Sequence, residues 1–188
     1  MPGRSCARRH RPPHRAEALT PFAHRFAMLA LATAPYERFY VSDLELAGDG
    51  PTYTVATLRR FREAVPAEHL YFLLGSDSFS QIATWHRWEE LVELAHLVVL
   101  HRETVWADAL RRAVPAALHA RMRTVAPFTA VADPAAGERL VYLLDHEPFP
   151  VSATSLRERL RAGTTIHELV PPEVHRYIVK YRLYRQGG

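Results

Sequence analysis

Short apolar runs alternate with amphipathic segments along most of this chain. Four runs have the length and residue types of a strand: residues 38–42, 70–74, 96–100 and 140–144. The runs at 70–74 and 96–100 are almost entirely apolar, a pattern typical of strands buried on both faces of a parallel sheet. The chain therefore predicts a sheet with at least two strongly buried strands.

Helical patterns fill the intervals between these strands. Thr20-Pro21 predicts a helix start, with a capping hydroxyl followed by a first-turn proline, and Thr54 is expected to cap a second helix. Pro115 should break or kink the long helical pattern in which it lies. The predicted helices cover residues 21–31, 54–64, 88–95, 106–122, 155–161 and 172–181.

This alternation predicts an α/β domain built on a mostly parallel sheet. Ligands of such sheets bind beyond the carboxyl ends of the strands. Gly75-Ser76-Asp77, Arg102 and Ser152-Ala153-Thr154 each follow a predicted strand. We therefore expect these three groups to lie on one rim of the sheet.

Length and composition fit a single globular domain. The 188 residues are 48% hydrophobic and 23% charged, enough for a core that needs no covalent staple. No apolar run approaches the ~18 residues that span a bilayer. Cys6 is the only cysteine, which excludes an intramolecular disulfide and a cysteine-rich zinc site and fits a cytoplasmic protein.

The net charge of +4 comes from the start of the chain. Residues 1–15 hold five arginines and no acidic residue, and the remainder carries 19 basic against 20 acidic residues, a net charge of −1. We expect residues 1–15 to be a basic loop or disordered segment and 16–188 to be the domain. A nucleic-acid partner would depend on this segment alone, so we expect none.

Asp77 follows a predicted strand at a glycine turn. A carboxylate there can accept two hydrogen bonds from the vicinal hydroxyls of a ribose. It can equally cap the turn that follows. The tripeptide does not decide between these roles.

Ser152, Thr154 and Arg157 combine two hydroxyls at a helix start with a guanidinium one turn later. Free backbone N–H groups, the helix dipole and the arginine would together bind a phosphate. The alternative is an ordinary helix cap with a solvated arginine.

The remaining candidates are aromatic or histidine side chains. Trp85 and Trp88 could stack on a flat ring, although such tryptophans more often pack in a core. The eleven histidines show no metal-ligand spacing, and no Gly-x-Ser-x-Gly elbow supports a hydrolase.

Ordered motifs over nearly the whole chain resemble the bacterial nicotinate-nucleotide adenylyltransferases. These are Pro12-Pro13-His14-Arg15, His24-Arg25-Phe26-Ala27-Met28-Leu29, Ser42-Asp43-Leu44-Glu45-Leu46, Pro51-Thr52-Tyr53-Thr54-Val55, Gly75-Ser76-Asp77-Ser78, Thr84-Trp85-His86-Arg87-Trp88 and Val151-Ser152-Ala153-Thr154-Ser155-Leu156-Arg157. Each motif is short, but their order makes the set specific.

The resemblance implies a Rossmann-like nucleotidyltransferase fold, with helices on both faces of the sheet. It also implies transfer of AMP from ATP to nicotinate mononucleotide, with Mg²⁺, giving nicotinate adenine dinucleotide and pyrophosphate in NAD synthesis. Carried over by motif, the ATP-binding residues would be Gly75, Asp77, Ser152, Thr154, Arg157 and Arg15. The nicotinate-nucleotide residues would be Tyr53, Thr54, Trp85 and Arg102.

One departure from the family pattern affects the expected activity. The family opens with a strand and a Gly-Gly-x-Phe-Asp-Pro-x-His-x-Gly-His loop whose histidines bind ATP phosphates, and this sequence contains no such motif. We expect the first strand–loop–helix unit to be missing, through a start placed too far downstream or because the chain is a remnant, and turnover to be low. Alternatives are a non-catalytic nucleotide-binding protein or a related adenylyltransferase acting on nicotinamide mononucleotide or phosphopantetheine.

Overall fold

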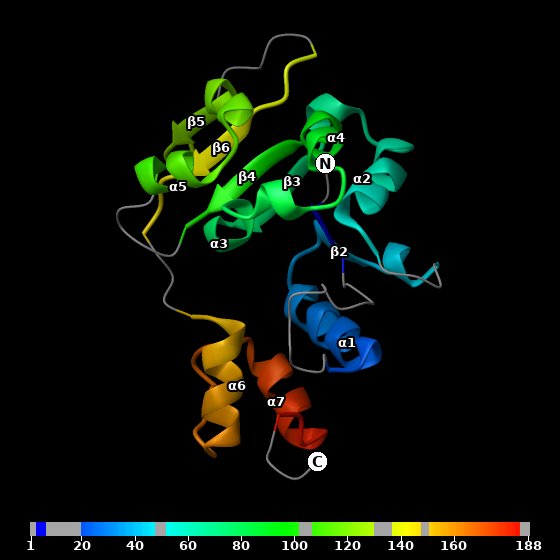
Figure 1. Ribbon diagram of the computed structural model, residues 1–188. Coiled ribbons are helices and arrows are strands. Elements are labelled where there is room, and N and C mark those ends of the chain that lie inside the picture. Colours follow the sequence, from blue (N-terminus) through cyan, green and yellow to red (C-terminus); the bar gives the residue numbers. More distant parts are fainter. Residues whose placement is uncertain are drawn as a thin grey trace. The chain divides into compact units, whose positions relative to one another are not determined.

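A computed structural model describes residues 3–6, 20–47, 52–101, 107–129, 137–147 and 151–184. The chain divides into two compact units (Figure 1). Unit 1 combines Met1–Thr52 with Val151–Gly188, and unit 2 is Tyr53–Pro150. Each unit contains parallel strands and an apolar core of its own.

Four parallel strands form the sheet of unit 2, in the order β3-β4-β6-β5. They are β3 (Tyr71–Gly75), β4 (His96–Leu100), β5 (Met122–Val125) and β6 (Val141–Leu144). The parallel sheet and the predicted strands at 70–74, 96–100 and 140–144 are confirmed. The sequence pattern missed β5, because the run Met-Arg-Thr-Val is short and half polar.

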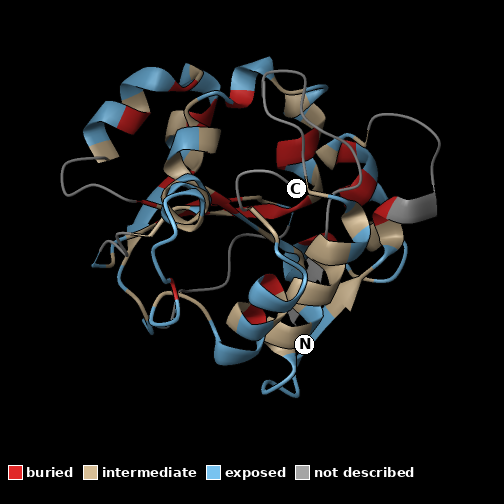
Figure 2. Cartoon of the chain, turned by 90° about the horizontal axis from the view of Figure 1, so that it is seen from below, coloured by how far each residue is buried: buried red, intermediate tan, exposed pale blue. Residues whose placement is uncertain are grey.

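Helices connect these strands and cover one face of the sheet. They are α2 (Thr54–Arg62), α3 (Ser76–Phe79), α4 (Trp88–Leu94) and α5 (Ala107–Ala113), with 3₁₀ turns η2 (Ala67–His69), η3 (Ile82–Thr84) and η4 (Ala116–Arg121). Leu74, Val99 and Leu143 lie on the covered face and are buried in the core. Buried residues are red in Figure 2. Val55 and Leu58 of α2 join the same core, in agreement with the predicted apolar face of that helix.

The opposite face of β3 corrects one expectation. Tyr71 and Leu73 are 48% and 60% exposed, so β3 is not buried on both faces. β3 is one of the two edge strands of this sheet, and its alternate side chains point away from the core. The exposed Tyr71 ring stacks on buried His96 at 5.0 Å between ring centroids.

The long helical pattern at 106–122 ends earlier than its hydrophobic spacing suggested. α5 stops at Ala113, and Pro115 precedes η4 as its cap residue. The backbone then extends directly into β5 at Met122. The predicted break at Pro115 is confirmed, because proline cannot supply the N–H that a continuing helix needs.

Unit 1 contains α1 (Phe22–Thr33), α6 (Ala153–Arg161), α7 (Pro172–Lys180) and the 3₁₀ turn η1 (Leu44–Ala47). Its buried core is Ile166, Val174 and Ile178, against which partly buried residues of the helices pack. β2 (Phe39–Ser42) is the predicted strand at 38–42 and pairs in parallel with β1 (Gly3–Cys6). β1 lies within the segment that we expected to be a loop, and the other residues of 1–15 lie outside the described part of the chain.

Candidate functional site

Asp77 lies at the carboxyl end of β3, with its carboxylate folded over the backbone of Gly75. A Cβ added to Gly75 would lie 2.4 Å from Oδ1 of Asp77, so this close approach requires glycine. Gly75 itself occupies the cap position of α3, and Asp77 lies in the first turn with its side chain exposed. Asp77 therefore does not cap the turn, and its carboxylate remains accessible to a ligand.

The carboxyl ends of neighbouring strands adjoin this position within unit 2. Gly75 of β3 pairs with Leu100 of β4, and buried His101 follows directly. The ring of His101 lies 4.7 Å from that of His146, two residues beyond β6. Sequence reasoning missed this histidine pair; the available signal was that each histidine closely follows a strand.

Ser152 caps α6, which is the alternative to phosphate binding that its sequence position allowed. Its hydroxyl accepts a hydrogen bond from the backbone N–H of Ser155 at 3.0 Å, and the Ser155 hydroxyl accepts one from the backbone N–H of Ser152 at 3.2 Å. This reciprocal pair is a capping box, which orders the first turn of the helix. The Ser152 side chain is therefore engaged with the helix itself.

Thr154 and Arg157 extend this helix start as a polar group. Thr154 is exposed, and its hydroxyl accepts a hydrogen bond from Nη2 of Arg157 at 3.3 Å. The guanidinium therefore lies beside the first turn, where backbone N–H groups and the helix dipole also favour an anion. The geometry is suited to phosphate binding.

Tyr53 and Thr54 form the start of α2. Tyr53 is the cap residue and makes no side-chain cap hydrogen bond, while its ring lies 4.3 Å from the ring of His86. Tyr53 is 44% exposed, so it presents an aromatic surface beside the turn that precedes α4.

Trp85 lies in that same turn and packs against the core of unit 2. Its indole contacts Phe72 of β3 edge-on, with the ring centroids 6.2 Å apart. Trp85 is only half-buried, so packing does not remove it from contact with a ligand. Its core contact and its predicted stacking role are compatible.

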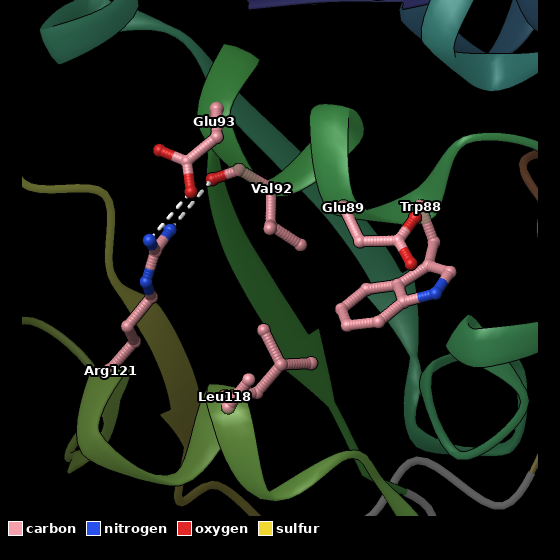
Figure 3. A pocket seen from close by; sticks show the side chains of 7 residues that line it. Trp88, Glu89, Val92, Glu93, Leu118 and Arg121 are labelled. Atoms are coloured by element: carbon pink, nitrogen blue, oxygen red, sulfur yellow. Dashed lines mark hydrogen bonds and ion pairs between the residues drawn. The ribbon is translucent and has the colours of Figure 1, made fainter.

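A pocket between α4 and η4 lies apart from these residues (Figure 3). It has a volume of about 110 Å³, whereas small-molecule sites typically measure roughly 300–1,000 Å³. At one end Arg121 pairs with Glu93 at 2.5 Å, and at the other lie Trp88 and Glu89. None of the predicted site residues lines this pocket.

The predicted site residues divide between the two units. Unit 2 brings Tyr53, Thr54 and Trp85 together with Gly75 and Asp77 in one body. Unit 1 holds the others for which the structure gives contacts, namely Ser152, Thr154 and Arg157. Arg15 and Arg102 lie outside the described residues, and the common rim for all three groups stays a prediction.

Two further features concern the described part of the chain only. It contains no group of three His, Cys, Asp or Glu side chains placed to hold a metal ion. None of its helices is long and apolar enough to cross a membrane.

Comparison with known proteins agrees with the ordered motifs. A family model described as cytidylyltransferase-like matches residues 6–159. A "Probable nicotinate-nucleotide adenylyltransferase" of Geobacter sulfurreducens is 37% identical over 178 residues, covering 94% of this chain and 82% of that protein. The protein of the same name in Aeromonas salmonicida is 40% identical over 176 residues, with 94% and 80% covered.

Solved structures share the fold at lower identity. The "Plasmodium falciparum nicotinic acid mononucleotide adenylyltransferase complexed with NaAD" superimposes with a TM-score of 0.66 and 22% identity, covering 96% of this chain and 81% of that one. The same enzyme "complexed with APC" gives a TM-score of 0.60 at 23% identity, with 88% and 77% covered. The chain therefore belongs to the cytidylyltransferase-like family and, within it, to the nicotinate-nucleotide adenylyltransferases, with their Rossmann-like nucleotidyltransferase fold.

Proposed function

We propose that this protein transfers AMP from ATP to nicotinate mononucleotide, forming nicotinate adenine dinucleotide and pyrophosphate. The observation that carries the proposal is the identity of 37–40% with relatives of that name across 94% of this chain. An exposed Asp77 at a strand end and the α6 helix start, where Arg157 donates to Thr154, support the proposal, since they could bind a ribose and phosphates.

The reaction is an in-line displacement that needs no protein nucleophile. An oxygen of the nicotinate mononucleotide phosphate forms a bond to the α-phosphorus of ATP, and the bond from that phosphorus to the pyrophosphate oxygen breaks. The work of the protein is to hold two anions in line and to neutralise the charge on the leaving group.

The described residues suggest how this work is divided. Asp77 would accept hydrogen bonds from an ATP ribose, while the first turn of α6, with Thr154 and Arg157, would hold ATP phosphates. Trp85 would stack on the nicotinate ring, and Tyr53 with Thr54 would shape its pocket. Arg15 and Arg102 are proposed as further phosphate and pyridine-nucleotide contacts on the motifs alone.

A divalent metal ion accompanies ATP in this class of reaction, and we propose Mg²⁺. Mg²⁺ usually keeps several waters and binds substrate phosphates rather than an all-protein cage, so we treat it as part of the ATP substrate. We also propose that the reaction takes place in the cytoplasm, in keeping with a single cysteine.

Calorimetric titration of the 188-residue chain tests the proposal. We expect binding of MgATP and of nicotinate mononucleotide, and formation of nicotinate adenine dinucleotide when both are present. Asp77→Asn should weaken ATP binding by about tenfold, since it replaces an ionised hydrogen-bond acceptor. Asp108→Asn, at an exposed position of α5, is the matched control and should leave both dissociation constants unchanged.

The second candidate function is nucleotide binding without catalysis, for which an exposed Asp77 and the α6 helix start with Thr154 and Arg157 would suffice. It would show as ATP binding, lost in Asp77→Asn, with no detectable dinucleotide product after prolonged incubation. Titration with nicotinamide mononucleotide in parallel measures the preference for acid over amide. Absence of binding to either substrate would contradict both functions.

A further inference from the structure

The turn that carries Trp85 and His86 ends in a strained residue. Arg87 has φ 53° and ψ 46°, in the left-handed region that disfavours residues with a Cβ, and it is the cap residue of α4. Such conformations persist only where the surroundings hold them, and they concentrate at functional sites. Contacts with α4 hold Arg87 in this conformation.

Glu90, in the first turn of α4, contacts Arg87 directly. Its Oε2 lies 2.5 Å from Nη2 of Arg87, so the carboxylate ties the strained residue to the helix that it caps. The backbone supports the same turn, because the N–H of Glu90 donates to the carbonyl oxygen of Arg87 at 3.1 Å.

The same carboxylate also binds α2. Arg59 donates from Nε to Oε1 of Glu90 at 2.5 Å and from Nη2 to Oε2 at 2.8 Å. This is a bidentate arginine–carboxylate pair, whose planar geometry fixes orientation as well as distance. Glu90 therefore joins α2, whose cap residue is Tyr53, to the turn that carries Trp85 and His86.

The rings at the two ends of this connection lie against each other. Tyr53, the cap residue of α2, and His86 are 4.3 Å apart between ring centroids, with 32° between their planes. A change in the relative position of α2 and α4 would open or shift this contact. The proposed wall of the nicotinate pocket is thus made of two segments that Glu90 holds together.

We propose that Glu90 is a positioning residue for the pyridine nucleotide, fixing Tyr53 and the Trp85–His86 turn relative to each other through Arg59 and Arg87. The inference rests on the proposed function, which assigns Tyr53 and Trp85 to that substrate. Its effect is on geometry more than on stability, since the pair is partly exposed and exposed ion pairs contribute little to folding.

The charge of this cluster is maintained well below neutral pH. The hydrogen bond from Arg59 is the main cause that lowers the pKa of Glu90 from its ordinary value, and the charges of Arg59 and Arg87 add to it. The carboxylate thus stays ionised throughout the pH range of a binding experiment.

The test compares Glu90→Gln with Glu93→Gln in calorimetric titrations of the 188-residue chain. Glu93 lies on the same helix but pairs with Arg121 at 2.5 Å, whereas Arg59 and Arg87 pair with Glu90. We expect Glu90→Gln to weaken nicotinate mononucleotide binding by about tenfold with less than a twofold change for MgATP. Glu93→Gln should leave both dissociation constants unchanged.

Two further variants separate positioning from a general loss of structure. Arg87→Gly accepts the left-handed backbone but lacks the guanidinium, and should lose part of the same affinity. The double variant Arg59→Gln/Glu90→Gln should bind no more weakly than Glu90→Gln alone, because both changes break one connection.

The outcomes are distinct. Wild-type affinity for nicotinate mononucleotide in Glu90→Gln would overturn the inference and leave the proposed function standing. An equal loss for both ligands with a lower melting temperature would also overturn it, because Glu90 would then be merely structural. Wild-type protein that binds no nicotinate mononucleotide would overturn the proposed function, and this inference with it.

Discussion

At the residue scale, the side chain of Asp77 leaves no room for a Cβ at Gly75. Its φ of −75° is open to any residue, so backbone conformation does not require glycine here. The requirement comes from the carboxylate of Asp77, which occupies the space that a Cβ would take. The Gly-Ser-Asp motif is thus a device for folding an acidic side chain back over a strand end.

The variant Gly75→Ala should separate ligand binding from stability. Asp77 is exposed and can rotate away from the new methyl group, so we expect the free energy of unfolding to change by less than about 1 kcal/mol. The displaced carboxylate should weaken ATP binding by about tenfold. Urea unfolding and calorimetric titration measure the two effects.

Gly163→Ala is the control variant, which should lower stability but not ATP affinity. Gly163 has φ 74°, so alanine there is strained and should cost about 1 kcal/mol of stability without changing ATP affinity. A Gly75→Ala protein that loses stability but binds ATP normally would contradict the account of the motif.

At the element scale, the start of α6 combines a structural role with a proposed binding role. The hydroxyl of Ser152 belongs to the capping box, whereas Thr154 and Arg157 face the exposed first turn. The sequence left capping and phosphate binding as alternatives. In the structure the Ser152 hydroxyl takes part in the cap and Thr154 stays exposed in the same turn, where phosphate binding is our proposal.

Substitutions at Ser152 can therefore distinguish the two roles. Ser152→Ala should cost about 1 kcal/mol of stability through loss of the cap. Ser152→Asp should retain stability, because aspartate caps a helix well, but its negative charge should weaken ATP binding several-fold by repelling the phosphates. Chemical denaturation gives the first effect and calorimetry the second; equal ATP affinity in the Asp and Ala variants would exclude a phosphate at this helix.

Among the other elements, the hydrophobic pattern predicted where strands lie better than it predicted which of their side chains are buried. The apolar run at 70–74 correctly predicted β3, but not that Tyr71 and Leu73 would be solvent-exposed. A run of apolar residues reports extended backbone, whereas burial depends on what covers each face of the sheet. β5 could not be predicted in this way, because its sequence is half polar and has no apolar run. Its pairing with β6 defines it as a strand.

At the scale of the whole molecule, the apolar cores coexist with a buried titratable group, His96. It is fully buried in unit 2, and its Nδ1 accepts a hydrogen bond at 3.1 Å from the backbone N–H of Leu140, just before β6. Burial is the main cause that lowers the pKa of His96 from its ordinary value of 6.5, with a further contribution from the charge of Arg139. Folding therefore favours the neutral form of this imidazole.

This burial predicts a pH-dependent stability. Well above pH 6.5 the histidine is neutral in both folded and unfolded chains, so its contribution to stability is fully present. As the pH falls, the unfolded chain takes up a proton first, and the free energy of unfolding should decrease by at most about 1.4 kcal/mol per pH unit. Urea unfolding of the 188-residue chain between pH 7 and 5 measures this slope. Tryptophan fluorescence reports on unit 2, which holds all three tryptophans.

His96→Asn should flatten that slope, because the amide oxygen can accept the same hydrogen bond without titrating. His167→Asn, at an exposed position, should leave the slope as in the wild type. An unchanged slope in His96→Asn would rule out this histidine as its source.

The sequence by itself predicted the alternation of strands and helices apart from β1 and β5, and its ordered motifs indicated the family. It could do so because hydrophobic periodicity and short motifs are local properties of the chain. Tertiary structure alone decided that Asp77 folds over Gly75, that Tyr53 lies against His86, and that Glu90 joins α2 to α4. These relations connect elements distant in sequence or set the direction of a side chain, and only packing in three dimensions specifies either.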